Sequence, residues 1–566
     1  MIHRFCQPAP YAETHYVVRA VPVSRYYRRC PEILADIPRR VEPGFDLPIL
    51  LIVKDAHRFP VTIHSITIQW QESGLPPKEF TIDQKIDSPY WSKLLAIPTD
   101  KLPHRTLTLD VLIRATQNGQ EFFIRNDNYI GTSHASFSVN ISEHPFPKLP
   151  GWLAGDLHIH TRYTNDQVEF GAPIFDTARI AQAQGLDFFA AADHSYNLDD
   201  TWDNYLKNDP HLHKYKAYTE GIDSWNRESG NTLQIIPGIE VSAGNQHHRN
   251  VHLLVLGLGE FISGKGDSAE TWFRTHPDLT IPQVIERLSD HRVALAAHPE
   301  IPFPIAERWF LGRGIWENHD FTNRGLVGLQ IVRGTDQVPF QAGINLWVKL
   351  LLQGVKLSIT AGSDAHGDFN RCVKIHIPMI RLKESHHPVF GEALTLIPID
   401  HFLHTMQGGI KVGAKGFFPP TTVGGNIRGV LDSFIYHLQT GRTGITTGPG
   451  ISLRFQDKQG YTHFPGDQCL ESSPLLFAGG NKGGVAMLEA ISSPEFGAIT
   501  HAVIWAGNRT LQAEELVWID RPPSSTFRCE REIAVTGNPD WHYLRAEIRT
   551  LNNQEIGRAL TGAIHL

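Results

Sequence analysis

Over residues 1–148, apolar and polar residues alternate in short runs. This two-residue period is typical of strands with one buried face. Turn-forming residues separate the runs, as at Asn118-Gly119, and no long segment has the 3.6-residue period of a helix. The pattern therefore predicts an N-terminal β-sandwich domain. Its expected strands lie at 47–54, 61–70, 107–114 and 135–141.

The pattern changes at residue 152, after a proline-rich linker over 143–151. Short, almost continuously apolar runs now alternate with helical segments. The runs predict strands at 152–160, 187–193, 233–242, 251–258, 293–298, 326–332 and 356–362. Helices are expected at 176–184, 215–228, 281–291 and 337–353. Parallel strands buried on both faces have such continuous apolar sequences. Residues 149–445 therefore predict an α/β fold, a TIM-like seven-stranded (β/α)7 barrel.

The last part of the chain returns to a strand pattern. A further strand is expected at 373–382, followed by a glycine-rich irregular loop over 408–425 and a helix at 430–439. Residues 446–566 then predict a C-terminal β-sandwich domain, with strands at 451–455, 486–492, 502–506, 515–519 and 541–548. The chain is thus expected to contain three domains, at 1–148, 149–445 and 446–566.

Composition narrows the class of protein. The 566 residues are 41% hydrophobic and 20% charged, with a net charge of −7, so bulk charge favours neither a nucleic acid nor a membrane as partner. We find no signal peptide and no apolar stretch long enough to span a membrane, so we expect a cytoplasmic protein. The five cysteines are scattered, which argues against a disulfide framework and against a cysteine-built zinc site.

Metal-ligand residues recur where the predicted barrel strands end. His158 and His160 are two positions apart on the first strand, so they share a face. The strands that follow end in Asp193-His194, Glu240, His298 and Asp364-Ala365-His366, and Asp166 lies shortly after the first strand. In barrels of this kind such ends meet at one face. The pattern therefore predicts a metal site, in which we expect Asp193 to orient a ligand rather than to bind.

His252 is the exception, because it lies near the start of its strand. The connection from Glu240 covers only residues 241–249 and is turn-like, too short for a right-handed parallel crossover. A hairpin would place the start of this strand beside the end of the one before it. We therefore expect His252 to reach the same rim as Glu240.

These motifs resemble those of the polymerase and histidinol phosphatase (PHP) superfamily of metal-dependent phosphoesterases. The resemblance covers about residues 152–372. Its marks are Asp156-Leu-His158-Ile-His160-Thr161, Ala192-Asp193-His194, Gly238-Ile-Glu240, His252-Leu-Leu-Val-Leu-Gly257, His298-Pro299 and Gly362-Ser-Asp364-Ala-His366. The resemblance implies a distorted seven-stranded barrel and a site for three metal ions.

The resemblance also implies how the ligands divide. His158, His160, Glu240 and Asp364 would hold one ion, and Glu240 would bridge to a second ion held by His252 and His298. Asp166, His194 and His366 would hold a third. Many relatives have Ser-Asp-Gly after the first motif, whereas this chain has Thr164-Asn-Asp166-Gln, one position later. A site for two ions therefore stays open.

The flanking β domains, and the segment Gly441-Arg442-Thr443-Gly-Ile-Thr-Thr-Gly-Pro449, resemble the carbaryl-hydrolase-like branch, some of whose members cleave carbamate esters. The alternative is that this segment is only a helix stop and a turn. Mixed histidine and carboxylate ligands suit Zn, Mn or Fe. We expect Arg162, Arg371 and Arg442 to be candidates for substrate binding, because arginine binds phosphate or carboxylate with two hydrogen bonds.

The function expected from these residues is hydrolysis of a phosphoester (EC 3.1) by water activated at two or three divalent ions. Glu240, His194 and Asp193 are the expected catalytic residues, and a small-molecule ester is the expected partner. One alternative is hydrolysis of a carbamate, carboxylic ester or amide at the same site. A second alternative is a binding module in which the metal is structural, although structural sites are usually closed by four ligands.

Overall fold

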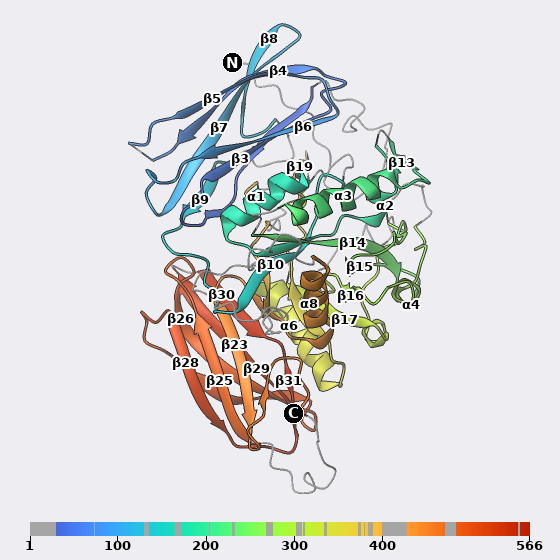
Figure 1. Cartoon of the computed structure of the whole chain (residues 1–566), viewed down its shortest axis with the longest axis vertical. Helices are drawn as coiled ribbons and strands as arrows, with labels where there is room; N and C mark the ends of the chain where they lie inside the picture. The colour runs from blue at the N-terminus through green and yellow to red at the C-terminus, as the bar shows by residue number, and fades with distance from the viewer. Residues whose placement is uncertain are drawn as a thin grey trace.

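The computed structural model describes residues 30–72, 74–128, 135–164, 171–202, 204–228, 232–267, 275–300, 308, 312–332, 337–371, 375–377, 380–382, 389–398, 427–469, 483–552 and 555–566. Figure 1 shows three regions along the long axis: N-terminal sheets at the top, the central region, and the C-terminal sheets at the bottom. Strands dominate, since this part of the chain contains 31 strands and six α-helices. None of the described helices is long and apolar enough to cross a membrane.

Two sheets form the N-terminal region. One contains β1 (Glu32–Asp36), β3 (Leu47–Lys54) and β6 (Tyr90–Ile97). The other has the order β2 (Arg40–Val41), β9 (Phe137–Ile141), β7 (Thr106–Gln117), β4 (Val61–Trp70) and β5 (Lys78–Ile86), with β8 (Gln120–Arg125) also paired to β7. Apolar residues of both sheets meet in one core. The strands predicted at 47–54 and 61–70 are confirmed, and Ile63, Ile66 and Ile68 of the second are buried in this core, with a register shift between Ile63 and Ser65.

All seven strands predicted for the central region are present. They are β10 (Trp152–Ile159), β11 (Phe188–Ala191), β14 (Gln234–Gly244), β15 (Asn250–Gly257), β16 (Arg292–Ala296), β17 (Leu326–Val332) and β18 (Ser358–Ala361). They belong to a 14-stranded sheet of order β18-β17-β16-β15-β14-β11-β10. The same sheet continues through β21 (Leu394–Pro398), β22 (Gly444–Thr446), β30 (Glu555–Thr561), β29 (Trp541–Asn552), β26 (Ala498–Asn508) and β27 (Ala513–Asp520). Its fourteenth strand, β31 (Ile564–His565), also pairs with β29.

The expected α/β class and the TIM-like (β/α)7 barrel are wrong, because the protein is β-rich and its central strands form a mixed sheet. β15 is antiparallel to both of its neighbours, β14 and β16, and β10 is antiparallel to β21. The parallel pairs lie on either side of this break, from β10 through β11 to β14 and from β16 through β17 to β18. Continuous apolar runs report burial on both faces of a strand, and they do not report its direction.

The ends of β10 and β18 nevertheless lie together, and this contact assembles the candidate site. Asp364 donates its backbone N–H to the carbonyl of His158 at 2.6 Å. His160 donates its own to the carbonyl of Ala365 at 2.9 Å. The segment after β18 therefore lies against the histidine pair at the end of β10.

Helices cover the sheet on both sides. They are α1 (Ile174–Gln184), α2 (Ser195–Leu198), α3 (His213–Arg227), α4 (Ile281–Ile285), α6 (Gln337–Leu352) and α8 (Ile427–Thr440). Figure 1 shows α1 and α3 on the side of the N-terminal sheets and α6 and α8 on the side of the C-terminal sheets. The helices predicted at 176–184, 215–228, 337–353 and 430–439 are confirmed to within three residues. The helix predicted at 281–291 is shorter: it begins at the capping box of Thr280 and Gln283 but ends at Ile285.

The C-terminal region packs a second sheet against the part of the large sheet formed by β26, β27, β29 and β30. This sheet contains β24 (Thr462–His463), β23 (Gly450–Asp457), β25 (Gly484–Ile491) and β28 (Arg528–Val535). Its apolar residues belong to the same core as those of the central strands. The strand expected at 373–382 is instead a pair of short antiparallel strands, β19 (Ile375–Ile377) and β20 (Ile380–Leu382). The expected glycine-rich loop over 408–425 lies outside the described residues.

Candidate metal centre

The first group of converging side chains has two histidines and two carboxylates, all buried. His160 Nε2 lies 3.0 Å from Asp364 Oδ1 and 3.4 Å from Glu240 Oε2. His158 Nε2 lies 3.3 Å from Asp364 Oδ1 and 3.5 Å from Glu240 Oε2. Three segments thus meet at one point: the end of β10, strand β14 and the segment that follows β18.

A second group shares Glu240 with the first. His252 Nδ1 lies 2.7 Å from Glu240 Oε1, and His298 Nε2 lies 3.3 Å from the same oxygen. The predicted hairpin is confirmed, because β14 and β15 are antiparallel with Ser242 opposite His252. Glu240 is therefore a diagonal neighbour of His252 on the same face of the hairpin. We expected Glu240 to lie at the end of its strand. The strand instead continues to Gly244.

The third group consists of His160, His194 and His366. The rings of His160 and His366 stack with centroids 4.0 Å apart, and His194 Nδ1 lies 2.9 Å from Glu240 Oε2. Asp166, which we predicted as a ligand beside them, lies outside the described residues. The structure thus brings together the other eight predicted ligands, and whether they bind metal stays a prediction.

Hydrogen bonds select which ring nitrogens face the centre. His158 Nδ1 lies 2.9 Å from Gln330 Oε1, an acceptor, so Nδ1 carries the proton. His366 Nδ1 likewise donates to the backbone carbonyl of Asp364 at 3.0 Å. His160 Nδ1 lies 3.1 Å from Thr164 Oγ1. The Nε2 atoms of His158 and His160 consequently face inward, 3.2 Å apart.

Two of the candidate ligands have backbone conformations that residues with a side chain rarely adopt. His298 has φ of 29° and Asp364 has φ of 57°. Such left-handed conformations are unfavourable outside glycine and are typical of functional sites, where surrounding contacts hold them in place. Asp364 is held by the backbone bond to His158, which fixes the direction of its carboxylate.

The charges of the cluster are strongly coupled. Burial would raise the pKa of Glu240, but the surrounding histidines, His252 and His158 first, hold it well below its usual value. Burial alone would lower the pKa of His158, yet Asp364 and Glu240 raise it. For His194 and His298, burial is the largest effect and lowers the pKa. The protons on His158 and His252 thus supply positive charge, which a bound cation would replace.

The residues fit a metal ion. Glu240 Oε2, His252 Nδ1 and both ring nitrogens of His194 are buried and have no hydrogen bond of suitable geometry within the described chain. Buried polar atoms without such bonds are uncommon in proteins. Here His194 Nδ1 and His252 Nδ1 lie 2.9 Å and 2.7 Å from the two oxygens of Glu240. The buried histidine and carboxylate groups of this protein can therefore hold a metal ion.

Asp193 lies beside the cluster but directs its carboxylate elsewhere. Oδ1 accepts the backbone N–H groups of Thr161 at 2.9 Å and Thr164 at 2.7 Å. Oδ2 accepts the Thr161 hydroxyl at 2.8 Å. Asp193 therefore orients the turn that carries His160 and its partner Thr164.

The three arginines considered for substrate binding lie in different surroundings. The guanidinium of Arg162 lies 5.4 Å from the ring centroid of Tyr163 and 6.0 Å from that of Trp202. Arg371 is buried in an ion pair with Asp36, 3.1 Å away. Arg442 is paired with Asp467 at 2.9 Å, at the opposite end of β18 from Asp364. Arg371 and Arg442 thus form ion pairs with aspartates of the chain itself, and their substrate-binding role stays a prediction.

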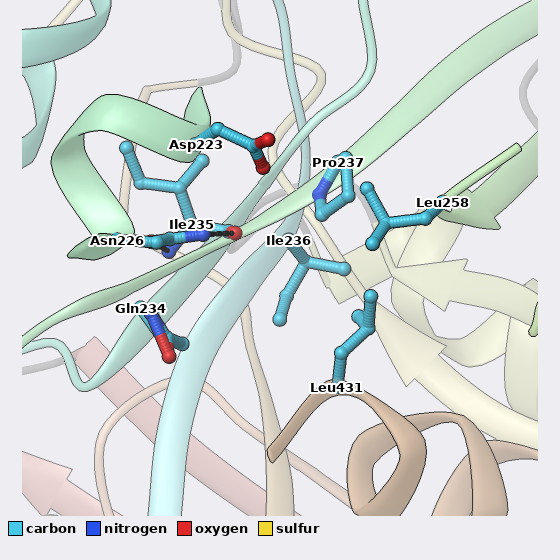
Figure 2. A pocket seen from close by; sticks show the side chains of 8 residues that line it. All are labelled: Asp223, Asn226, Gln234, Ile235, Ile236, Pro237, Leu258 and Leu431. Atoms are coloured by element: carbon cyan, nitrogen blue, oxygen red, sulfur yellow. Dashed lines mark hydrogen bonds between the residues drawn. The ribbon is translucent and has the colours of Figure 1, made fainter. Parts of the chain in front are cut away.

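Two hollows of the structure lie away from the metal centre. The one in Figure 2 has a volume of about 10 Å³, no more than a water molecule needs, between α3, β14 and α8. It is lined by Asp223, Asn226, Gln234, Ile235, Ile236, Pro237, Leu258 and Leu431. The other, of about 270 Å³, lies between the start of β18 and the C-terminal region and includes Lys356 and His565. Neither hollow includes a candidate ligand.

Several residues of the site were not found from the sequence. Asp156 accepts the backbone N–H of Ser363 at 2.8 Å and of Gly391 at 3.1 Å, so it ties β10 to the segments after β18. Burial raises its pKa to about 6. Gln330 and Asp267 are further examples, because each contacts a candidate ligand from a segment distant in sequence. Only Asp156, within the first motif, had a sequence signal that could have marked it.

Comparison with known proteins gives no closer identification. No family model matches the chain, and no curated protein matches it. Among solved structures, the β-glucuronidase of Parabacteroides merdae aligns with 95% of this chain and 64% of its own length, at 8% identity and a TM-score of 0.17. The same enzyme with glycerol in its active site aligns over 95% and 63%, at 8% identity and a TM-score of 0.17. The chain spans less than two thirds of these proteins, and likeness at this level carries no argument, so the resemblance to the PHP superfamily stays a prediction.

Proposed function

We propose that this protein is a metal-dependent hydrolase that holds two or three divalent ions and uses water to cleave an ester bond, with a small-molecule phosphoester as the first substrate class. The observation that carries the proposal is the position of Glu240. Its Oε2 lies within 3.5 Å of ring nitrogens of His158, His160 and His194, and its Oε1 within 3.3 Å of those of His252 and His298. A carboxylate with each oxygen in a different group of ligands is suited to bridge two ions.

Asp364 supports the same arrangement from the other side. Its Oδ1 faces His158 and His160, and its Oδ2 lies 3.8 Å from His298 Nε2. Divalent ions, if held by these histidines and carboxylates, would supply a bound water with a pKa lowered from about 15.7 towards 7 and would stabilise charge on the oxygens of the reacting group. Imidazole and carboxylate ligands together fit Zn, Mn or Fe.

The chain's own residues have distinct parts in this proposal. Glu240 and Asp364 would provide the negative charge that balances the ions. In the two-ion form of the site, in which His194 holds no metal, His194, beside Glu240 Oε2, is the candidate for proton transfer to the leaving group. Asp193 holds the turn of His160 in place. The side chain of His298 is 15% exposed, more than that of any other described candidate ligand, so we propose that substrate approaches from its side.

Carbamate, carboxylic ester or amide hydrolysis would use the same water and the same residues, so it is the alternative within this proposal. A small-molecule ester as partner and a cytoplasmic location also belong to the proposal. The binding-module alternative, with a purely structural metal, is less well supported. Structural zinc sites are closed by four ligands, whereas eight candidate ligands converge here in three overlapping groups.

The test is metal analysis of the purified protein followed by a substrate panel of p-nitrophenyl phosphate, bis-p-nitrophenyl phosphate, p-nitrophenyl acetate and 1-naphthyl methylcarbamate. We expect two or three metal equivalents per chain and turnover of at least one phosphoester. Glu240→Gln should lower turnover at least about 100-fold, as expected for loss of a charge that stabilises the reacting centre. The surface variant Glu286→Gln is the control and should match the wild-type protein.

Three outcomes would contradict the proposal in different ways. If the protein binds no metal, even after incubation with Zn, Mn and Fe salts, the proposed metal site is wrong. Full metal loading without turnover of any ester would favour the binding module. Turnover of the carbamate or the acetate, with no phosphoester cleaved, would show that the protein is a hydrolase of another substrate class.

A further inference from the structure

Asp267 is a buried carboxylate that contacts a candidate ligand from outside the cluster. It is 0% exposed, and its Oδ2 lies 2.9 Å from His252 Nε2. It lies in the connection between β15 and α4, ten residues beyond the end of β15, and belongs to none of the ligand groups described above. Its segment is attached to the end of β14 through the contact between Ser242 and Lys265.

The two nitrogens of His252 face opposite groups. Nδ1 points into the cluster, 2.7 Å from Glu240 Oε1, and Nε2 points away from it toward Asp267. A neutral imidazole has one protonated nitrogen and one with a lone pair, and only the latter can bind a metal. The group that faces Nε2 therefore decides whether Nδ1 offers a lone pair to the centre.

The carboxylate of Asp267 is itself held on several sides. The hydroxyl of Ser242 donates to Oδ1. Arg313 is buried, with Nε 3.1 Å from Oδ2 and Nη1 2.5 Å from His252 Nε2. A guanidinium only donates, so of the two groups that face Nε2 only Asp267 can accept its proton, and Nη1 must turn away when Nε2 is protonated. Ser242 is on β14 and His252 on β15, so the group spans the hairpin. Asp267 thus has little freedom to turn away from the imidazole.

We propose that Asp267 is a positioning residue for the metal centre: it accepts the N–H of His252 Nε2, so that Nδ1 keeps its lone pair for the ion shared with Glu240 and His298. Arg313 holds the carboxylate in this orientation. The inference rests on the proposed function, because it concerns a ligand of the same centre. A carboxylate behind a metal-binding histidine fixes the ring and strengthens it as a donor.

The experiment measures metal rather than turnover. Wild-type protein, Asp267→Asn and Arg313→Lys are loaded with Zn, dialysed against a graded series of chelator concentrations, and analysed for equivalents retained. We expect Asp267→Asn to lose one equivalent at a chelator concentration 10- to 100-fold lower than wild type, the usual effect of removing such a partner. Arg313→Lys keeps the positive charge but loses the Nε contact, so a smaller shift is expected.

The matched control is Asp187→Asn, which changes another buried aspartate of the central sheet, paired with Lys148 and remote from the candidate ligands. It should retain every equivalent. The visible spectrum of the Co-loaded proteins provides a second measurement, in which Asp267→Asn should lose the absorption of one ion. If Asp267→Asn does not fold, the metal retained by Arg313→Lys tests the proposal in its place.

The inference is overturned if Asp267→Asn, or Arg313→Lys in its place, retains all equivalents at the wild-type chelator concentration. It is also overturned if Asp187→Asn loses metal equally, because the effect would then be general destabilisation. Failure of the proposed function is a separate result. Wild-type protein that binds metal and cleaves no ester leaves the role of Asp267 intact.

Discussion

At the scale of single residues, the proton position on each histidine determines what the cluster can bind. Gln330 and the carbonyl of Asp364 accept protons from the Nδ1 atoms of His158 and His366, which leaves their Nε2 atoms for a metal. His252 has the opposite arrangement, with Nδ1 inward. The sequence marks the histidines themselves, but the acceptors are distant along the chain and have no fixed spacing from them.

His565 allows a prediction about acid stability. Burial, together with the positive charges of Lys356 and Arg509, lowers its pKa to about 4. Between pH 6.5 and 4 the unfolded chain binds a proton that the folded chain does not, so the free energy of unfolding falls as the pH is lowered through this range. The full shift corresponds to about 3 kcal/mol, and partial exposure of the ring reduces our expectation to about 1–2 kcal/mol.

Urea-unfolding midpoints of wild-type protein and His565→Gln at pH 7.5 and pH 5 measure this difference. The variant should lose less stability on acidification than the wild type. His213→Gln, at a histidine with a 66% exposed side chain, serves as the control and should behave as the wild type does. Equal acid loss in all three proteins would contradict the prediction.

At the scale of elements, the centre depends on how closely β10 and β18 approach. Gly362 follows β18, and a Cβ atom at this position would lie 2.6 Å from the backbone nitrogen of His158 and 2.7 Å from its Cβ. Only a glycine fits there without moving the strand that carries two candidate ligands. The motif Gly362-Ser-Asp364-Ala-His366 contains this glycine, but the physical reason for it is visible only in the contact between the two strands.

Gly362→Ala should therefore displace His158 and weaken metal binding. Overpacking of this kind typically costs about 1–3 kcal/mol of folding free energy. We expect a lower thermal unfolding temperature and fewer metal equivalents per folded chain than in the wild type. Differential scanning calorimetry and metal analysis of the same preparation measure both.

Gly221→Ala is the matched control, because the nearest atom to its added Cβ would be Ile174 Cδ1 at 3.4 Å, an ordinary contact. It lies inside α3, where alanine is favoured over glycine by about 0.5–1 kcal/mol. Gly221→Ala should keep full metal content with equal or higher stability. Full metal binding by Gly362→Ala would show that the strands can separate without cost to the centre.

At the scale of the whole molecule, Arg40 joins the N-terminal sheets to the other two regions. Its Nε lies 2.9 Å from Glu495 Oε1 in the C-terminal region, and its Nη1 lies 2.8 Å from Glu42 Oε1 and also donates to the carbonyl of Gln184 at the end of α1. The residue is 9% exposed. Three parts of the chain thus share one buried cation.

Arg40→Met should destabilise the protein by about 3–5 kcal/mol, because it retains much of the apolar stem and leaves two carboxylates without their buried cation. Urea unfolding followed by tryptophan fluorescence measures this loss. Arg114→Met removes an arginine from the pair with Glu121, whose side chains are 50% and 45% exposed, and should cost less than about 1 kcal/mol. Similar losses for both variants would contradict the joining role of Arg40.

The sequence by itself predicted the seven strands of the central region, four of its helices and the candidate ligands. Burial leaves a local record, because every second residue of a one-sided strand, and almost every residue of a strand covered on both faces, must be apolar. The short turn between Glu240 and His252 likewise permits only a hairpin, as found. Histidines and carboxylates at the predicted strand ends form a pattern that the sequence alone contains.

Only the tertiary structure decided the direction and neighbours of the strands, and with them the class of the fold. An apolar run is equally compatible with parallel and antiparallel neighbours, so the expected barrel was replaced by a mixed sheet that continues into the C-terminal region. The same reason applies to the site. The contacts of Glu240 with five histidines, and of Asp267 with His252, join segments far apart in the chain, and no local pattern encodes such distances.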